Sequence, residues 1–155
     1  MPQESKIAYA VEAYPDIIEE MKVLFDAHWE EIDGDKDAIK LDPKYESYER
    51  MHKSGMLHMV TAREGSKMIG YLVSFVATHL HYAARLTAHW DIYYIAPEYR
   101  HGRVGIQLFK FSEAALKAIG VQKIYAHTSL KNDIGPILER LGYLPTERVY
   151  TKLVG

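Results

Sequence analysis

The sequence contains no cysteine. This absence excludes disulfide bonds, a thiolate nucleophile and thiolate metal ligands, so any catalyst in this chain must use other side chains. An excess of charge of one sign is also lacking, because 19 Lys and Arg residues face 21 Asp and Glu residues, giving a formal net charge of -2 with His neutral. No overall basic field is available to hold a polyanion, and we expect no nucleic-acid partner.

Long apolar runs are missing as well. The longest apolar stretch, residues 69–82, is broken by Gly70, Ser74 and His79, which leaves it too short and too polar to cross a bilayer. The N-terminal segment has acidic residues and no long apolar core, unlike a secretory signal or an Arg-rich transit peptide. We therefore expect a cytoplasmic protein with no membrane partner.

What the sequence does contain is typical of one globular domain. Its 155 residues are 48% hydrophobic and 26% charged, which suits a single domain spanning residues 1–155. It is rich in side chains that can carry or pass a proton, with 12 Tyr and 8 His. Tyr is also an ordinary packing residue, so this richness alone assigns no function.

Apolar periodicity predicts the order of the elements. Strands are expected over residues 6–12, 57–63, 68–81, 85–95, 123–128 and 143–153, and helices over 17–29, 45–52, 106–119 and 134–141. A loop is expected near Ala83 and Ala84, and residues 33–37 lack the EF-hand pattern and are expected to form a solvated loop. The order β-α-α-β-β-β-α-β-α-β predicts an α/β (α+β) fold, with an antiparallel meander followed by a crossover that favours parallel pairing.

One segment, residues 91–105, carries most of the chemical information. A strand that Pro97 must end leads into a basic loop with two glycines, and this loop opens a helix near Val104. The first amides of a helix lack internal partners and lie at the positive end of its dipole, so they can bind a phosphate. Arg100 and Arg103 add positive charge. From spacing alone, a basic turn that merely caps the helix is an equally good interpretation.

Residues 94–105 resemble the acetyl-CoA motif of the GNAT superfamily of acyl-CoA-dependent N-acyltransferases, V-x-P-x-[YFW]-R-x-x-G-x-G, with Leu108 at the expected place in the helix. Residues 132–143 resemble the closing segment of that family. The resemblance implies a mixed, mostly antiparallel central sheet flanked by helices and splayed near Ile95. The backbone of residues 93–95 would face the pantetheine arm, and the loop amides would bind the pyrophosphate. The implied cofactor-binding residues are Tyr93, Tyr94, Ile95, Arg100, His101, Gly102, Arg103, Val104, Gly105 and Asn132.

Two positions depart from the family pattern. Arg103 stands where the first glycine of the motif is usual, so Gly102 would have to substitute. Leu138 stands where many relatives carry the tyrosine that protonates the leaving thiolate, and leucine has no proton to donate. Another tyrosine, such as Tyr143 or Tyr150, or water would have to act, unless the thiolate leaves without a dedicated acid.

Amine acylation needs a group that takes a proton from the amine. His89 and Asp91 lie two apart on the strand before the loop, hence on one face, and relatives commonly carry Glu, Asp or His there. We predict that one of these two residues is the catalytic base. The residues between and after them, Trp90, Ile92 and Tyr94, are expected to be core on the other face.

A histidine cluster is expected beside this pair. His79 and His81 share a face of the preceding strand, and with Tyr82 they are predicted to line the acceptor pocket. Together with His89 and Asp91 they also permit a zinc or iron site, although the family chemistry needs no metal and we expect none. A plain wall of hydrogen-bonded histidines is the third interpretation. The remaining histidines, His28, His52, His58 and His127, form no constellation and are expected to be surface or packing residues, while His101 belongs to the loop.

The predicted activity is that of an N-acetyltransferase, which moves an acetyl group from acetyl-CoA to a primary amine by direct transfer in a ternary complex. The lack of cysteine excludes an acyl-cysteine intermediate. The acceptor amine belongs to a small molecule or a protein; Tyr45, Tyr48, Tyr82, Glu46 and Glu49 suggest a cationic one, although a solvated helix face also explains the acids. Many relatives dimerise, so a homodimer is allowed. The alternative is a non-catalytic acyl-CoA-binding or interaction module.

Overall fold

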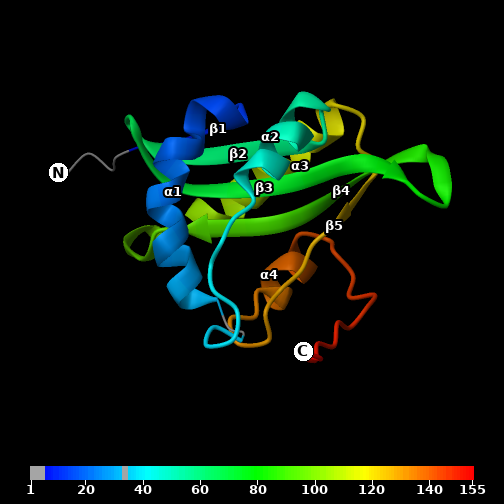
Figure 1. Cartoon of the computed structure of the whole chain (residues 1–155). Helices are drawn as coiled ribbons and strands as arrows, with labels where there is room; N and C mark the ends of the chain where they lie inside the picture. The colour runs from blue at the N-terminus through cyan, green and yellow to red at the C-terminus, as the bar shows by residue number, and fades with distance from the viewer. Residues whose placement is uncertain (1–5, 33–34) are drawn as a thin grey trace.

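The computed structural model describes residues 6–32 and 35–155 and is built on a five-stranded sheet (Figure 1). The strands lie in chain order across the sheet, β1 to β4 pairing antiparallel and β5 joining β4 in parallel. The expected mixed, mostly antiparallel sheet is thereby confirmed. The strands are β1 (Ile7–Val11), β2 (Leu57–Glu64), β3 (Lys67–His79), β4 (Tyr82–Ile95) and β5 (Lys123–Tyr125).

Helices cover both faces of the sheet (Figure 1). The first two helices pack on one face, and the last two pack on the other with a separate apolar cluster. Pro15 lies in the first turn of the first helix, where its missing N–H costs nothing. The helices are α1 (Tyr14–Glu31), α2 (Tyr45–Lys53), α3 (Val104–Ala118) and α4 (Gly135–Arg140), with a short 3-10 turn, η1 (Pro97–Tyr99), after β4.

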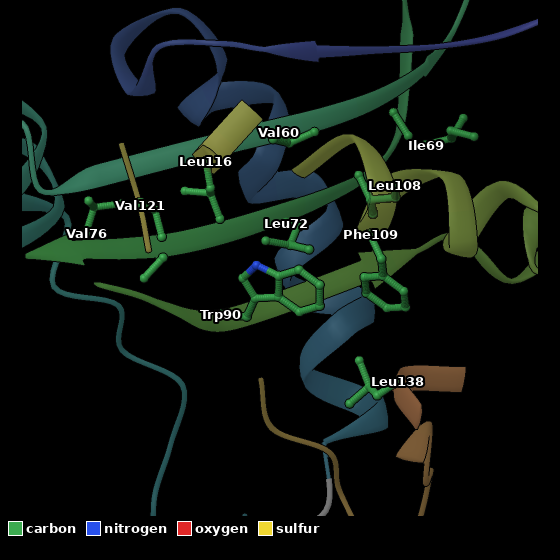
Figure 2. Packing of buried hydrophobic residues seen from close by; sticks show 12 residues of the cluster. Val60, Ile69, Leu72, Val76, Trp90, Leu108, Phe109, Leu116, Val121 and Leu138 are labelled. Atoms are coloured by element: carbon green, nitrogen blue, oxygen red, sulfur yellow. The ribbon is translucent and has the colours of Figure 1, made fainter. Parts of the chain in front are cut away.

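The alternation of β3 explains the two clusters. Leu72 belongs to the cluster under α3, whereas Tyr71 and Val73 belong to the cluster under α1, as expected when successive side chains point to opposite faces. Trp90 of β4 is fully buried on the α3 side, and Figure 2 shows it beside Leu72 and Phe109. Each large side chain buried in this way contributes roughly 2–3 kcal/mol to stability.

The sheet opens between β4 and β5. Their parallel pairing ends where His89 meets Tyr125, although β4 continues to Ile95 and stays paired with β3 on its other side. Residues 91–95 therefore have no ladder partner on the side of β5. The sheet is thus splayed, but the splay begins directly after His89 and not near Ile95 as expected.

A β-bulge lies at the start of this opening. Ser74 of β3 pairs with Trp90 and its neighbour Val73 pairs with Ile92, so Asp91 is an extra residue in β4. Because of this extra residue, Trp90 packs in the cluster under α3 while Ile92 packs in the cluster under α1. The expectation that Trp90, Ile92 and Tyr94 share one face is therefore wrong, although all three contribute to the core.

The strand expected over residues 143–153 is not formed. Residues 143–155 take no ladder bonds, and Leu144, Val149 and Tyr150 are exposed. Apolar alternation suits a strand, but a strand also needs an edge to pair with, and Pro145 has no N–H to give to one. In the structure this tail follows α4 as an extended segment (Figure 1).

The turn between β3 and β4 also differs from the expectation. It lies at Leu80 and His81, where the His81 N–H donates to Nδ1 of His79 at 3.1 Å. Ala83 and Ala84, expected in a loop, belong to β4. The loop expected over residues 33–37 lies partly outside the described residues. Among the helices of residues 6–32 and 35–155, none combines the length and the apolar character that crossing a membrane requires.

Candidate active site

A cavity of about 730 Å³ occupies the opening between β4 and β5. This volume lies within the range of small-molecule and cofactor sites. Its walls come from the ends of α1 and β4, the start of α3, the segment after β5 and the start of α4. The residues that line it are His28, Glu31, Ile32, Asp91, Ile92, Tyr93, Tyr94, Ile95, Arg100, Gly102, Gly105, Ile106, Phe109, His127, Thr128, Ser129, Asn132, Asp133, Ile134 and Ile137.

The loop before α3 presents free backbone amides to one end of the cavity. Arg103, at the N-cap of α3, makes no side-chain cap, and the first turn of the helix contains no acidic residue. Gly102 has a φ of 76°, a left-handed conformation that favours glycine. Gly105 has open space where a side chain would stand. Uncapped amides beside glycines are the features that let a helix N-terminus bind a phosphate or diphosphate.

Most of the predicted cofactor-binding residues line this cavity. Seven of the ten do so: Tyr93, Tyr94, Ile95, Arg100, Gly102, Gly105 and Asn132. The other three, His101, Arg103 and Val104, are not among its lining residues, although their backbone belongs to the same turn. The predicted role of this turn depends on its amides and not on these side chains.

Arg100 lies differently from the expectation of a free phosphate-binding side chain. Its Nη2 donates to both carboxylate oxygens of Glu31 at 2.6 Å, and its Nε donates to the carbonyl of Ile95 at 2.7 Å. The guanidinium also lies over the ring of Tyr94, 5.4 Å from its centroid. Arg100 thus connects the end of α1 to the end of β4, and both partners line the cavity.

The structure separates the two residues predicted as the base. Asp91 lines the cavity, where burial raises the pKa of its carboxyl and the nearby His127 counteracts part of this rise. His89 stacks on Tyr125 with ring centroids 4.5 Å apart and is not among the lining residues. Burial, together with the charges of His127 and His79, lowers the pKa of His89. The geometry therefore favours Asp91 over His89.

His127, for which a surface or packing role is expected, belongs to the cavity wall. It lines the cavity, and its Nδ1 lies 2.9 Å from the carbonyl oxygen of Trp90. The hydroxyl of Tyr93 donates to the backbone carbonyl of His127 at 3.0 Å. In the parallel pair, residue 89 meets 125, and continuing this offset places 127 opposite 91. This offset would have predicted that His127 lies beside Asp91, but the register between β4 and β5 cannot be read from one sequence.

The wall formed by α1 contains a second histidine. His28 lines the cavity, and its Nδ1 lies 2.7 Å from the hydroxyl of the fully buried Tyr71. Burial lowers the pKa of His28 and raises that of Tyr71. Burial thus disfavours the charged form of His28, a hydrogen-bonded wall residue, in keeping with its expected packing role.

The predicted acceptor-pocket residues lie elsewhere. His79, His81 and Tyr82 are at the tip of the β3–β4 hairpin, and none of them lines the cavity. The ring of His79 contacts the rings of both others, with centroids 5.7 Å from His81 and 4.9 Å from Tyr82. Within the described part of the chain, no three His, Cys, Asp or Glu side chains are arranged to hold a metal ion. The zinc or iron interpretation therefore finds no support in the geometry.

A family model described as the acetyltransferase (GNAT) family matches residues 18–143. The chain belongs to the acetyltransferase (GNAT) family. A search of curated proteins finds no match.

Solved structures share this GNAT fold at low sequence identity. The aminoglycoside N-acetyltransferase AAC(6')-Iy in complex with CoA is 18% identical, with a TM-score of 0.73, covering 99% of this chain and 98% of its own. An aminoglycoside acetyltransferase from an uncultured soil metagenomic sample, solved with sisomicin, is 14% identical with a TM-score of 0.71, covering 96% and 95%. A ribosomal-protein-alanine N-acetyltransferase from Brucella melitensis biovar Abortus 2308 is 14% identical with a TM-score of 0.69, covering 97% and 100%.

One position at which the family resemblance implies a tyrosine lies outside the lining of the cavity. Leu138, at the place of the usual tyrosine, is 7% exposed and packs in the cluster under α3. Ile134, the N-cap of α4, and Ile137 of α4 line the cavity with apolar surface. The wall formed by α4 therefore brings no proton donor from residue 138.

Proposed function

We propose that this protein is an N-acetyltransferase of one domain, which transfers an acetyl group from acetyl-CoA to a primary amine by direct transfer in a ternary complex. One observation supports this most strongly: the cavity between β4 and β5 joins uncapped amides at the start of α3 to the free carboxyl group of Asp91. An anionic cosubstrate and a cationic acceptor can enter the same cavity and meet beside β4.

The residues of the cavity fit acetyl-CoA. Its pyrophosphate would be bound by the amides of residues 101–105, where Gly102 and Gly105 allow close approach. Its pantetheine arm would lie along residues 93–95, whose β5 side has no ladder partner. When bound, acetyl-CoA supplies the electrophilic thioester carbonyl. Backbone amides near Ile95 would polarise that carbonyl.

The charges of the cavity favour a cationic acceptor. Three carboxylates line it: Glu31 is paired with Arg100, Asp133 accepts from the N–H of Gly135 at 2.7 Å, and Asp91 makes no ion pair among the described contacts. Tyr48 of α2 is close enough to Asp91 for the charge of that carboxylate to add to burial, the main cause, in raising the pKa of Tyr48. An ammonium group would be drawn to Asp91 between β4 and α2. The similar structures named above include enzymes for aminoglycosides and for a protein alanine, which are both amine acceptors.

Binding and transfer can be measured separately. Isothermal titration with acetyl-CoA tests the cosubstrate, and release of free thiol from acetyl-CoA with a panel of primary amines tests the transfer. Binding with amine-dependent thiol release supports the proposal. Binding without release by any amine indicates the non-catalytic acyl-CoA-binding module, and no binding at millimolar acetyl-CoA overturns both.

Gly105 offers a matched pair of variants for the phosphate end. A side chain at this position meets no atom within 4 Å, so both Gly105→Glu and Gly105→Gln are expected to fold. The glutamate places a negative charge beside the amides that would bind the pyrophosphate, and we expect it to weaken acetyl-CoA about tenfold more than the glutamine does. Equal affinities for the two variants would place the phosphates elsewhere.

A further inference from the structure

We infer that His127 is the catalytic residue that accepts a proton from the acceptor amine, through its Nε2. This inference deepens the proposed function and rests on it. It assigns the proton transfer to a residue of the segment after β5, whereas the sequence pointed to His89 or Asp91 of β4.

The position of His127 is fixed at two points by β4. Its ring is hydrogen-bonded to the carbonyl of Trp90, and its own carbonyl accepts from the hydroxyl of Tyr93. Trp90 and Tyr93 lie on either side of the bulge at Asp91. The bulge therefore presents to His127 both the carbonyl that orients its ring and the carboxyl group that lies near it.

The hydrogen bond to Trp90 also determines which ring nitrogen is free. A carbonyl oxygen can only accept a hydrogen bond, so Nδ1 of His127 must carry the proton in the 2.9 Å contact. In the neutral ring Nε2 is then left with a lone pair. His127 lines the cavity and is exposed, and in the proposed site this lone pair lies against a bound amine.

The charged and titratable groups around His127 suit this role. On β4, Asp91 lies close enough for its charge to stabilise an imidazolium, and His89 has a pKa that burial lowers first and the charge of His127 lowers further. The hydroxyl of Tyr93 of β4 donates to the backbone carbonyl of His127, and Asp133 of the loop before α4 accepts from the hydroxyl of the next residue, Thr128, at 3.3 Å. Across the cavity, Glu31 of α1 is neutralised by Arg100. Asp91 is thus a carboxylate whose charge interacts with the imidazole of His127, and among the described residues it forms no ion pair with Lys or Arg.

The proton transfers balance without another acid or base. Nε2 takes one proton from the ammonium, and the freed lone pair on nitrogen forms the C–N bond with the acetyl carbon. When the C–S bond breaks, its electron pair goes to sulfur, and the proton on Nε2 neutralises the thiolate. The second proton leaves the new amide nitrogen for solvent. Because the imidazolium returns its proton, the lack of a tyrosine at Leu138 leaves no step without a donor.

The tautomer can be tested without any turnover. Long-range ¹H–¹⁵N NMR spectra of the protein alone, with His127 assigned by comparison with His127→Gln, report which ring nitrogen is protonated. We expect a neutral ring protonated at Nδ1. A ring protonated at Nε2 would overturn the inference, because its lone pair would then face the backbone of Trp90.

The kinetic test uses His127→Gln, since a glutamine amide can still donate to the Trp90 carbonyl but cannot take a proton. With a primary amine that the wild type acetylates, we expect kcat at neutral pH to fall roughly 10²–10³-fold. The pH profile of kcat/KM should also change. In the variant it should rise up to the pKa of the amine, whereas the wild type should reach its plateau at a lower pH.

His52→Gln provides the matched control, because His52 lies on α2 and does not line the cavity. It should retain the rate and the pH profile of the wild type. If His127→Gln keeps both, the assignment of His127 is wrong while the proposed function stands. If the wild type binds acetyl-CoA but acetylates no amine, the proposed function itself fails and the inference fails with it.

Discussion

Two arginines make multiple contacts with carboxylates, one away from the cavity and one in its wall. Arg63 bonds Glu12 at 2.8 Å and Glu20 at 2.9 Å, and its side chain is 19% exposed. Arg100 bonds Glu31 at 2.6 Å, and its side chain is 42% exposed. The more exposed Arg100 makes the shorter contact, so a short distance does not mark the more buried cluster. Their burial and their neighbours distinguish the two clusters.

The cluster around Arg63 joins parts of the backbone that have to stay together. Arg63 also donates to the carbonyl of Ser66 at 2.7 Å, Glu20 accepts from the N–H of Met68 at 2.9 Å, and Glu12 accepts from the hydroxyl of Thr61. It therefore fixes the end of β1 and the start of α1 to the β2–β3 turn. The Arg100 bridge instead spans a cavity that a ligand must enter, where exposure and salt weaken an ion pair. We therefore expect the Arg63 cluster to contribute more to the stability of the fold than the Arg100 bridge does.

The largest expected effect is on stability. Arg63→Met would leave two half-buried carboxylates without their cation, and we expect the free energy of unfolding to fall by about 2–3 kcal/mol. Arg100→Met is the matched change at the more exposed cluster and should cost less than about 1 kcal/mol. Urea unfolding followed by circular dichroism measures both. A larger loss for Arg100→Met would reverse the roles assigned to the two clusters.

The stabilisation by the Arg63 cluster is also expected to depend on pH, because both of its carboxylates have lowered pKa values. Burial alone would raise the pKa of Glu12, but hydrogen bonds from Arg63 and Thr61 outweigh it and lower the pKa; for Glu20 the hydrogen bond from Arg63 is the main cause of the lowered pKa. Lowered folded-state pKa values stabilise the protein above the ordinary pKa of glutamate, near 4.3, and this stability is lost as pH falls through the folded-state values.

Arg63→Met removes the cause of these shifts. The difference in unfolding free energy between the wild type and Arg63→Met should therefore shrink as the pH is lowered from 6 to 3. Unfolding by urea at a series of pH values measures this difference. A constant difference across that range would show that Arg63 stabilises the fold by packing and not by pairing with the two carboxylates.

The smallest expected effect concerns the affinity for acetyl-CoA. Glu31→Gln removes a negative charge from the cavity wall and releases Arg100 toward the bound phosphates, and we expect binding to become about threefold tighter at low salt. Glu30→Gln changes the same charge on the preceding residue of α1, which does not line the cavity, and should leave the affinity unchanged. Titration calorimetry at low and high salt measures both variants. An unchanged or weaker affinity for Glu31→Gln would show that the bridge does not compete with the cosubstrate.

The sequence predicted the fold as far as local pattern determines it. Alternation located β2, β3 and β4, Pro97 marked the end of β4, and residues 94–105 pointed to the family that residues 18–143 confirm. The terminal strand failed because alternation over residues 143–153 says nothing about whether an edge is available for pairing. The two ends of the chain thus carry similar patterns, but of these only β1 forms ladder bonds in the described structure.

The site was predictable only in the part that one segment supplies. Residues 93–95 and Asp91 follow each other along β4, and all of them line the cavity. His127 lines the same cavity although it follows Asp91 by 36 residues. Glu31 also lines it, 69 residues before its partner Arg100. Those partners depend on a parallel register and on the path of α1, which residue spacing does not encode. The predicted His79 cluster failed for the same reason, because the hairpin register places it at the tip.

The bulge in β4 has a consequence for insertions and deletions. Trp90 and Ile92 pair with consecutive residues of β3, so β4 would pair with β3 without a bulge at this point if Asp91 were absent. The pairing and the two core clusters do not need a residue at this position. A chain lacking Asp91 should therefore keep its sheet while losing both the carboxylate and the backbone geometry that orients His127. The sheet can be assembled without this residue, but the proposed site cannot.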